Sequence, residues 1–410
     1  MGRAGGAALR VGAAAMKIVQ SVYGIFHHFE LAHQLHRRGH LRRIYSTWPW
    51  ARLKREGLAR ELVRTFPPVH TADYLLRRTP VYSPRLDARF NEWNSLSFDA
   101  FMHARMEPCD ALIAISGAGL TTGPLVQSRG GRFICDRGST HQRFQDEVIA
   151  EEHRRWKVAY TAPAAHILRR EEAIYAAADA ITVPSAVARR SFLEMGVPAE
   201  KVHVIPYGVR LDRFHPDPAG AAAASRSAGR FEVLFAGQIS LRKGIPYLLH
   251  AFAAVRHPRK HMTLVGSVLD DVRGLLPGLP TDDVSFVGSL AQTELAARMA
   301  RSHVLALASV EEGLALVQGQ AMACGCPVVS TRASGAEDLF SDGVEGFIVP
   351  ERDTASLAEA LQRLADDPAL RAQMSSAALG RVHVLGGWDR YGQMWDDLLH
   401  GLTGLPHDPE

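Results

Sequence analysis

Short apolar runs that alternate with helical patterns extend along most of the chain. In the first half the runs are Lys17–Val22, Ala111–Ser116, Phe133–Asp136, Ala180–Pro184 and Lys201–Pro206. A second series consists of Glu232–Gly237, His261–Gly266, Val284–Gly288, Val304–Ser309 and Pro327–Thr331. Amphipathic segments with helical spacing lie between these runs, for example Phe29–Arg38, Gly244–Val255 and Thr293–Ser302. Buried strands that alternate with helices indicate parallel sheets covered on both faces, so we expect an α/β protein.

A segment rich in Pro, Gly, Ala and Ser separates the two series. We therefore expect two doubly wound, Rossmann-like domains that face a cleft: residues 16–215, a linker at 216–230, and residues 231–387. In such sheets ligands bind at the carboxyl ends of the strands, which places the expected site in the cleft. Residues 1–15 are Gly- and Ala-rich and interrupted by arginine, so they predict a disordered extension and not a secretory signal.

Composition and charge narrow the class of protein. Of the 410 residues 47% are hydrophobic and 22% charged, which excludes a mostly disordered, collagenous or coiled-coil chain. Four cysteines are too few for a disulfide framework, so we expect a reducing compartment. Residues 1–200 carry 28 of the 47 Lys and Arg residues and 19 of the 43 Asp and Glu residues. Residues 201–410 therefore carry the other 19 basic and 24 acidic residues. A basic first half and an acidic second half suggest different partners for the two halves, or simply solvated faces.

The segment SVEEGLALVQGQAMACGCPVV at residues 309–329 predicts a strand end, an acidic loop and a helix from about Leu316 to Ala323. The amino terminus of a helix offers unpaired N–H groups and a partial positive charge to a phosphate. Glu312 lies just before this helix and can accept hydrogen bonds from sugar hydroxyls, while Gln320 follows about two turns later near the same face. The alternative is that Glu311 and Glu312 only cap the helix.

This segment resembles the Glu-x7-Glu signature of retaining glycosyltransferases with the GT-B fold, specifically family 4. The resemblance implies that Glu312 contacts the donor sugar and that Gln320, at the position of the second Glu, hydrogen-bonds the nucleotide ribose without a charge. It also implies donor contacts for the residues that open the helix, which are Gly313, Leu314, Ala315 and Leu316.

A second motif, FAGQISLRKGI at residues 235–245, resembles the G-R-L-x-x-x-K-G element of the same family. Lys243 matches the family Lys, Gln238 follows Gly237 at the position of the usual Arg, and Arg242 adjoins the Lys. The resemblance implies that Arg242 and Lys243 neutralise the donor diphosphate. Two adjacent cations could stabilise a departing diphosphate that gains charge as the glycosidic bond breaks.

Further matches follow in the family order. The sequence FVGSL at 286–290 resembles the loop that packs on the nucleotide base and offers Gly288 and Leu290. The aromatic residues of the tail resemble the last helix of the family, which crosses back to complete the first domain, here at 388–402.

In the first domain the candidates are polar residues that follow predicted strands. Gly24, His27 and His28 follow the first strand, where Gly24 allows close backbone approach and the histidines either bind acceptor hydroxyls or cap a helix. His141 follows the run at Phe133–Asp136 and is the candidate for a family histidine that contacts the donor sugar, with Asp136 and Arg137 on the acceptor side. The alternative for Asp136 and Arg137 is a structural turn.

Several motifs are absent from the sequence. It contains no Asp-x-Asp that would clamp a metal on a diphosphate, no G-x-G-x-x-G that opens a helix after a first strand, and no serine nucleophile elbow. We therefore expect a metal-independent, retaining glycosyltransferase with no metal or cofactor, for which the nucleotide-sugar is a substrate. Two alternatives remain open: a nucleotide-sugar 2-epimerase on the same fold, and a non-catalytic nucleotide-sugar-binding subunit, suggested by Gln320 and Gln238.

The expected partners are the nucleotide-sugar donor and a glycan or lipid-linked acceptor, and no nucleic acid. The basic stretch His33–Arg64 carries Trp48 and Trp50, which suits contact with an anionic membrane or equally an ordinary solvated helix face. The family suggests a role in cell-surface glycan or glycolipid synthesis, and we expect a cytoplasmic protein at the inner face of the membrane.

Overall fold

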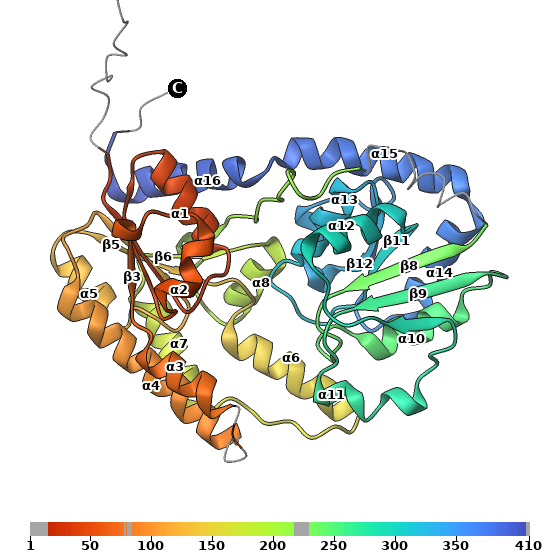
Figure 1. The fold of residues 1–410 in the computed structure, drawn as a ribbon, viewed down its shortest axis with the longest axis horizontal. Helices are drawn as coiled ribbons and strands as arrows, with labels where there is room; N and C mark the ends of the chain where they lie inside the picture. The colour runs from red at the N-terminus through yellow and green to blue at the C-terminus, as the bar shows by residue number, and fades with distance from the viewer. Residues whose placement is uncertain (1–14, 78, 80–83, 217–228, 407–410) are drawn as a thin grey trace, which may run out of the picture. The chain divides into compact units, whose positions relative to one another are not determined.

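The computed structural model describes residues 15–77, 79, 84–216 and 229–406 (Figure 1). The predicted amino-terminal extension therefore lies, except for Ala15, outside the described residues, and so does most of the predicted linker. The described chain contains two parallel β-sheets with helices between the strands. The predicted α/β class with two Rossmann-like sheets is confirmed.

The first sheet has seven strands in the order β3-β2-β1-β4-β5-β6-β7. All five residues of β1 are buried, Gln20 and Ser21 included, because β1 lies inside the sheet and pairs in parallel with β2 and β4. The strands are β1 (Ile18–Val22), β2 (Leu41–Ser46), β3 (Val63–Thr65), β4 (Ala111–Ile115), β5 (Arg132–Asp136), β6 (Ala180–Val183) and β7 (Val202–Val204). The accompanying helices are α1 (His28–Arg37), α2 (Trp50–Leu53), α3 (Pro68–Leu76), α4 (Pro84–Arg105), α5 (Thr122–Ser128), α6 (Gln142–Arg155), α7 (Ala165–Ala177) and α8 (Ala186–Glu194), with 3-10 turns η1 (Lys54–Glu56), η2 (Arg60–Leu62) and η3 (Ala199–Lys201).

The second sheet has six strands in the order β10-β9-β8-β11-β12-β13. They are β8 (Phe231–Ala236), β9 (Lys260–Val265), β10 (Val284–Phe286), β11 (Val304–Leu307), β12 (Val328–Thr331) and β13 (Gly346–Val349). The helices are α10 (Ile245–Ala254), α11 (Asp270–Arg273), α12 (Gln292–Arg301), α13 (Leu316–Ala323), α14 (Thr354–Asp366), α15 (Pro368–Leu385) and α16 (Trp388–Thr403), with 3-10 turns η4 (Leu276–Gly278), η5 (Arg332–Ser334) and η6 (Ala336–Asp338). Helix α10 packs against α14, and α13 packs against α15.

The order of the second sheet reverses direction between β8 and β11. These two strands are direct neighbours although 67 residues separate Ala236 from Val304, and the chain leaves both at the same edge. Such a switch point brings the two following loops together and is where open α/β sheets bind ligands. The topology therefore unites the two motifs that the sequence analysis had placed in separate segments.

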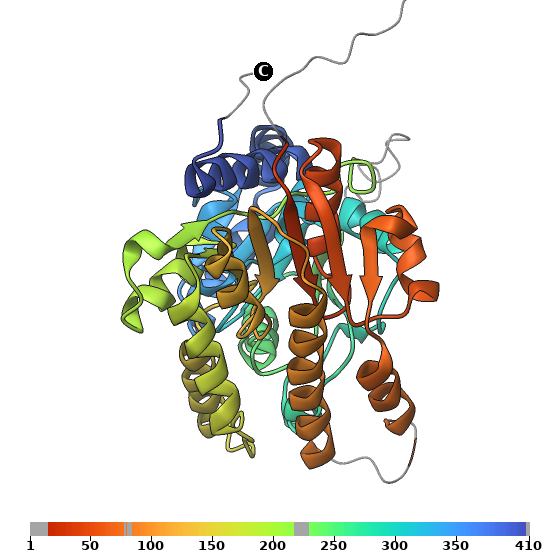
Figure 2. The ribbon, with the colours of Figure 1, turned by 90° about the vertical axis from the view of Figure 1, so that its left-hand side faces the viewer.

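The described chain forms two compact units. The first comprises residues up to 114, residues 118–134 and residues from 392, and the second comprises 115–117 and 135–391. In the first unit β1, β2 and β3 lie side by side, and α3 and α4 form a pair of packed helices (Figure 2). The second unit holds the end of β5, helices α6 to α8 and the complete second sheet. Among the described residues no helix is both long enough and apolar enough to span a membrane.

Candidate functional site

The loops that follow β8 and β11 are joined through their backbones. The Val310 N–H donates to the carbonyl oxygen of Arg242 at 3.0 Å. Gly244 has φ +64°, and a Cβ there would lie 1.9 Å from the carbonyl oxygen of Ala308. Only glycine permits so close an approach with positive φ, so the Lys-Gly of the second motif is the contact point between the loops.

Two ion pairs form beside this contact between the loops. Arg242 Nε lies 2.6 Å from Glu311 Oε2, and Lys243 Nζ donates to Glu312 Oε2. Ser309 Oγ also donates to Glu312 Oε2, at 3.3 Å. The Lys243 and Glu312 side chains keep 15% and 13% of their surface exposed. The structure thus brings together three residues predicted to act on the donor and neutralises each cation with a carboxylate.

Glu311 is the residue of this site that the sequence analysis missed, because it gave Glu311 only a capping role. Its side chain is fully buried. Oε1 accepts hydrogen bonds from Ser139 Oγ at 3.1 Å and Thr140 Oγ1 at 2.5 Å. Oε2 accepts from Gln145 Nε2 at 2.9 Å and from Arg242. The only sequence signal was the doubled Glu, whose two members face different partners.

Burial alone would raise the pKa of Glu311. The positive charge of Arg242 and the hydrogen bonds from Thr140, Gln145 and Arg242 outweigh burial and hold this pKa below its usual value. Glu311 is therefore a buried carboxylate that stays ionised, and Arg242 keeps a permanent counter-charge.

Three glycines hold the loops after β8, β9 and β10 against one another. The Gly237 N–H donates to the Val265 carbonyl at 2.9 Å, and the Gly266 N–H donates to the Gly288 carbonyl at 2.8 Å. A Cβ at Gly266 would lie 1.8 Å from the Gly237 carbonyl oxygen. The predicted donor residues Gly237 and Gly288 thus belong to one backbone network, beside which Gln238 is exposed. Leu290, also predicted to bind the donor, is partly buried.

The start of α13 is closely packed. A Cβ at Gly313 would lie 2.3 Å from the Gly138 carbonyl oxygen, and Leu314 and Ala315 are buried. The Ala315 N–H already donates to the Ser334 carbonyl at 3.0 Å, so this amide is not available to a phosphate. Leu316 and Gln320, also predicted to face the donor, are partly exposed on the same helix.

His141 is the N-cap of α6. Its Nδ1 accepts the Arg143 N–H at 3.2 Å, and its ring packs against Tyr175 and Phe192 with centroids 5.0 and 5.1 Å away. Only 3% of the residue is exposed, and burial lowers the pKa of His141 to about 4. These are the contacts of a neutral, buried cap, so we do not include His141 among the residues proposed to act on the donor.

Asp136 and Arg137 organise the turn between β5 and α6. Asp136 Oδ1 accepts from Thr182 Oγ1 at 2.9 Å. Arg137 donates to the Thr140 carbonyl at 2.9 Å and to Gln145 Oε1 at 2.8 Å. Arg137 thereby holds the two segments that present Thr140 and Gln145 to Glu311, which is the structural turn left open above. A direct contact of either residue with an acceptor stays a prediction.

Gly24, His27 and His28 lie in the first unit. Gly24 has φ +90°, its carbonyl accepts from Ser46 Oγ at 2.8 Å, and a Cβ there would lie 3.1 Å from the Trp48 ring. His27 occupies the N-cap position of α1, and His28 is fully buried. The predicted role of these residues toward an acceptor stays a prediction.

One group of possible metal ligands in the described part of the chain also lies in the first unit: His40, Asp396 and His400. His40 Nε2 lies 3.0 Å from Asp396 Oδ1, and its Nδ1 accepts the Met16 N–H at 3.2 Å. The His40 ring thus lies between the Met16 N–H and the Asp396 carboxylate.

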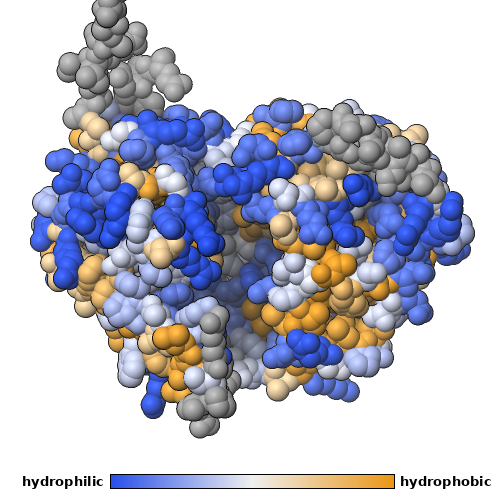
Figure 3. Space-filling view, in the orientation of Figure 1, coloured by the Kyte–Doolittle hydropathy of each residue, from blue (hydrophilic) through white to orange (hydrophobic). Residues whose placement is uncertain are grey.

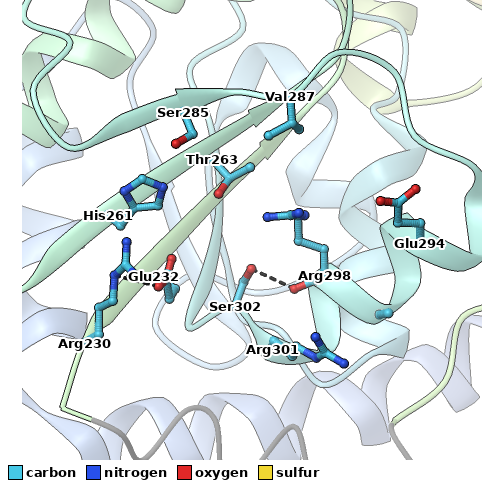
Figure 4. A pocket seen from close by; sticks show the side chains of 11 residues that line it. Arg230, Glu232, His261, Thr263, Ser285, Val287, Glu294, Arg298, Arg301 and Ser302 are labelled. Carbon is cyan, nitrogen blue, oxygen red and sulfur yellow. Dashed lines mark hydrogen bonds and ion pairs between the residues drawn. The ribbon is translucent and has the colours of Figure 1, made fainter.

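A cavity of about 450 Å³ lies on the second sheet beside α12 (Figure 4). Figure 4 shows Arg298 of α12 between Thr263 and Arg301, with His261 on the strands opposite. The lining residues are Arg230, Glu232, His261, Thr263, Ser285, Val287, Glu294, Ala297, Arg298, Arg301 and Ser302. No member of the two ion pairs lines this cavity, so it is separate from the site at the switch point.

Two family models match the chain. Residues 26–213 match the model described as Glycosyltransferase Family 4, and residues 230–367 match the one described as Glycosyl transferases group 1. A D-inositol 3-phosphate glycosyltransferase of Arthrobacter sp. (strain FB24) is 34% identical over 216 residues, which are 50% of this chain and 51% of the relative. A GDP-mannose-dependent alpha-(1-6)-phosphatidylinositol monomannoside mannosyltransferase of Mycobacterium tuberculosis is 30% identical over 238 residues, which are 54% of this chain and 62% of the relative. The matched part of the chain thus spans about half the length of the first of these relatives.

Solved structures share the fold over nearly the whole chain. Sucrose-phosphate synthase from Thermosynechococcus elongatus superposes with a TM-score of 0.71 at 22% identity, covering 95% of this chain and 99% of the other. Anabaena HepE in complex with UDP-glucose gives a TM-score of 0.66 at 21% identity, covering 94% and 100%. At these identities the likeness extends to the fold alone.

Proposed function

Because the chain belongs to the glycosyltransferases that its two matching family models describe, we propose that it transfers a sugar from a nucleotide-sugar to an acceptor hydroxyl. The observation that carries this proposal is the doubled ion pair at the switch point, Arg242 with Glu311 and Lys243 with Glu312. Cations that stabilise a leaving diphosphate and a carboxylate that accepts hydrogen bonds from sugar hydroxyls favour such a transfer, and these residues supply candidates for both.

Lys243 and Glu312 are the residues that change partners during binding. In the described structure each neutralises the other. A donor diphosphate would bind Lys243 in place of Glu312, and Glu312 would then accept a hydrogen bond from a hydroxyl of the donor sugar. Each of the two charges therefore has a counter-charge before a donor binds.

The chemical step follows from this arrangement. The bond between the anomeric carbon and the diphosphate oxygen breaks, and negative charge develops on the diphosphate beside Arg242 and Lys243. The acceptor oxygen forms the new bond on the same face, and its proton passes to the leaving diphosphate. Retention of configuration rests on the resemblance to family 4. Independence of metal rests on the two cations and on a sequence without Asp-x-Asp.

The acceptor is a glycan or a lipid-linked sugar in cell-surface synthesis, and the protein acts at the cytoplasmic face of an anionic membrane. The M. tuberculosis relative, whose name specifies a phosphatidylinositol monomannoside, supports a lipid acceptor. In the first unit Leu75 of α3 and Trp93 of α4 are both 58% exposed, and Figure 3 shows apolar surface over this helix pair. Together with the basic stretch His33–Arg64 they suit an interface with anionic lipid.

Co-sedimentation with vesicles tests the membrane contact. The protein should pellet with phosphatidylglycerol vesicles and not with phosphatidylcholine vesicles, and Trp93→Ser should weaken this binding. Val384→Ser, at a residue of α15 that is 75% exposed, is the matched control. Equal binding by both variants and the unchanged protein would refute a contact through α4.

A donor panel tests the activity. The purified protein is incubated with UDP-, GDP- and ADP-sugars in EDTA, and released nucleoside diphosphate is measured. We expect slow release from one donor, loss of release in Glu312→Ala, and normal release in Glu294→Ala, an exposed residue of α12. Epimerised sugar without an acceptor would favour the 2-epimerase, and donor binding without turnover across acceptors would favour the non-catalytic subunit. No binding of any donor would overturn the site.

A further inference from the structure

Glu311 is too deeply buried to contact a substrate and too well bonded to be an incidental cap. The carboxylate has four hydrogen-bond donors around its two oxygens, from Ser139, Thr140, Gln145 and Arg242. A carboxylate offers about four lone-pair positions, so Glu311 has no capacity left for a ligand.

The four donors come from distant parts of the chain. Ser139, Thr140 and Gln145 belong to the turn after β5 and the first turn of α6, whereas Arg242 lies in the loop after β8. Glu311 itself lies in the loop after β11. All of these segments belong to the second compact unit. Glu311 therefore ties the Arg242 loop to the start of α6.

The Arg242 guanidinium is only partly used by these contacts. Its Nε donates to Glu311 and its Nη2 donates to Ser139 Oγ at 3.2 Å. A guanidinium has five N–H donors in a fixed plane, so three remain for a ligand. The Arg242 side chain keeps 29% of its surface exposed while that of Glu311 keeps none. Two nitrogens of the guanidinium, Nε and Nη2, are thus anchored, while the side chain as a whole keeps part of its surface exposed.

We propose that Glu311 is a positioning residue that fixes the plane of the Arg242 guanidinium and so aims its free N–H groups at the diphosphate of the donor. This inference rests on the proposed function, because it assigns Arg242 to the donor diphosphate. Glu311 and Glu312, although adjacent, then have separate tasks: Glu311 holds one cation permanently, and Glu312 releases the other when the donor binds. Arg242 retains a neutralising partner throughout, whereas Lys243 exchanges its own.

The chain supplies a matched control for the removal of a buried carboxylate. Glu152, on α6, also has a fully buried side chain, which accepts from Arg352 Nε at 2.7 Å and from Trp156 Nε1 at 2.9 Å. Glu152→Gln removes the same charge from an equally buried pair that contains no proposed donor residue. A loss of stability alone should therefore appear in both variants.

The test measures the affinity of the unchanged protein for UDP, GDP and ADP by calorimetry and follows the tightest diphosphate together with its nucleoside. Glu311→Gln should weaken diphosphate binding about 10- to 100-fold, since small misplacements of a binding group have effects of that order. Affinity for the nucleoside should stay within about twofold, because the nucleoside lacks the phosphates that Arg242 contacts. Glu152→Gln should leave both affinities unchanged.

A double-mutant cycle asks whether Glu311 acts through Arg242. In an Arg242→Gln background, Glu311→Gln should weaken diphosphate binding less than about twofold further. Thr140→Val, which removes one hydrogen bond from Glu311 and no charge, gives a milder variant should Glu311→Gln not fold, and should weaken diphosphate binding a few-fold.

The outcomes separate the two proposals. If the unchanged protein binds a diphosphate and Glu311→Gln, or Thr140→Val in its place, binds it equally well, the positioning role is wrong while the donor site stands. Equal losses of diphosphate and nucleoside affinity would also overturn the positioning role, since they indicate a general structural defect. If the unchanged protein binds none of the three diphosphates, the proposed function fails and the positioning role with it.

Discussion

Replacing Gly244 by alanine tests whether the contact between the loops after β8 and β11 shapes the site. The added Cβ would lie 1.9 Å from the Ala308 carbonyl oxygen, and heavy atoms do not approach so closely without a shift of backbone. The loop carrying Arg242 and Lys243 would therefore move away from the loop carrying Glu311 and Glu312.

The expected cost has two parts. An alanine held at φ +64° costs about 1–2 kcal/mol relative to its preferred conformation. Forcing a methyl group into a packed contact costs about 1–3 kcal/mol more. The free energy of unfolding should thus fall by roughly 2–5 kcal/mol in Gly244→Ala.

The variant Gly196→Ala separates the conformational cost from the cost of the close contact. Gly196 has φ +81°, and a Cβ there would meet nothing within 4 Å, so only the conformational cost applies. The control also cancels the entropy that alanine removes from the unfolded chain. The two variants should differ by about 1–3 kcal/mol, or roughly 2–12 °C in melting temperature for a unit of this size.

Two assays on both variants check the reasoning. Calorimetric unfolding gives the difference in stability, and titration with a nucleoside diphosphate reports whether Arg242 and Lys243 have moved. Gly244→Ala should bind the diphosphate at least about tenfold more weakly, while Gly196→Ala should bind it as the unchanged protein does. Equal stability and equal affinity in the two variants would refute the argument, because they would mean that the close approach at Gly244 places no constraint on the loops.

Three further predictions concern single side chains. Lys243→Gln should weaken diphosphate binding about 10- to 100-fold through loss of a charge-assisted hydrogen bond. Calorimetry compares it with Lys201→Gln, because Lys201 Nζ donates to the carbonyls of Tyr175 and Ala176. An equal loss of affinity in the two variants would contradict the role of Lys243. His141 has a pKa of about 4 when folded and about 6.5 when unfolded, so the unfolded state takes up a proton first and stability falls as the pH drops from 6.5 toward 4. Between pH 8 and pH 5 the unchanged protein should lose about 2 kcal/mol more than His141→Asn in urea unfolding, and parallel pH profiles would disprove this. Ser185 caps α8 by accepting a hydrogen bond from the Ala188 N–H at 3.1 Å, and it donates to the Gly313 carbonyl. Ser185→Ala should therefore lower the free energy of unfolding in urea by about 1–2 kcal/mol. An unchanged midpoint of unfolding would argue against the cap.

Most of the strands that the sequence predicted, such as β6, β11 and β12, are buried on both faces, whereas β7 and β10 were predicted and are partly exposed. Val304–Leu307 is buried along its whole length and is an uninterrupted apolar run, and Ile18–Val22 is equally buried although it contains Gln20 and Ser21. Strand β2 was not predicted, because Arg42 and Arg43 interrupt its pattern. The structure pairs both arginines with Glu107, which lies far along the chain. A polar residue in a strand is compatible with the fold when its partner comes from elsewhere, and no local pattern reveals that partner.

Lys243, Arg242 and Glu312 became candidates because their segments resemble two family motifs, and each of them lies in a loop after a strand whose carboxyl end faces the ligand side of a parallel sheet. Local order therefore determined the class of fold, the two series of strands and the loops that carry charge. The role of Glu311 was decided only by tertiary structure, because its donors Thr140 and Gln145 lie about 170 residues away and the burial that makes them necessary exists only after folding. The same holds for His141, whose neutral state follows from the rings of Tyr175 and Phe192 packed around it. A sequence records which side chains can ionise, while the environment that decides whether they do is assembled from segments that meet only in the folded chain.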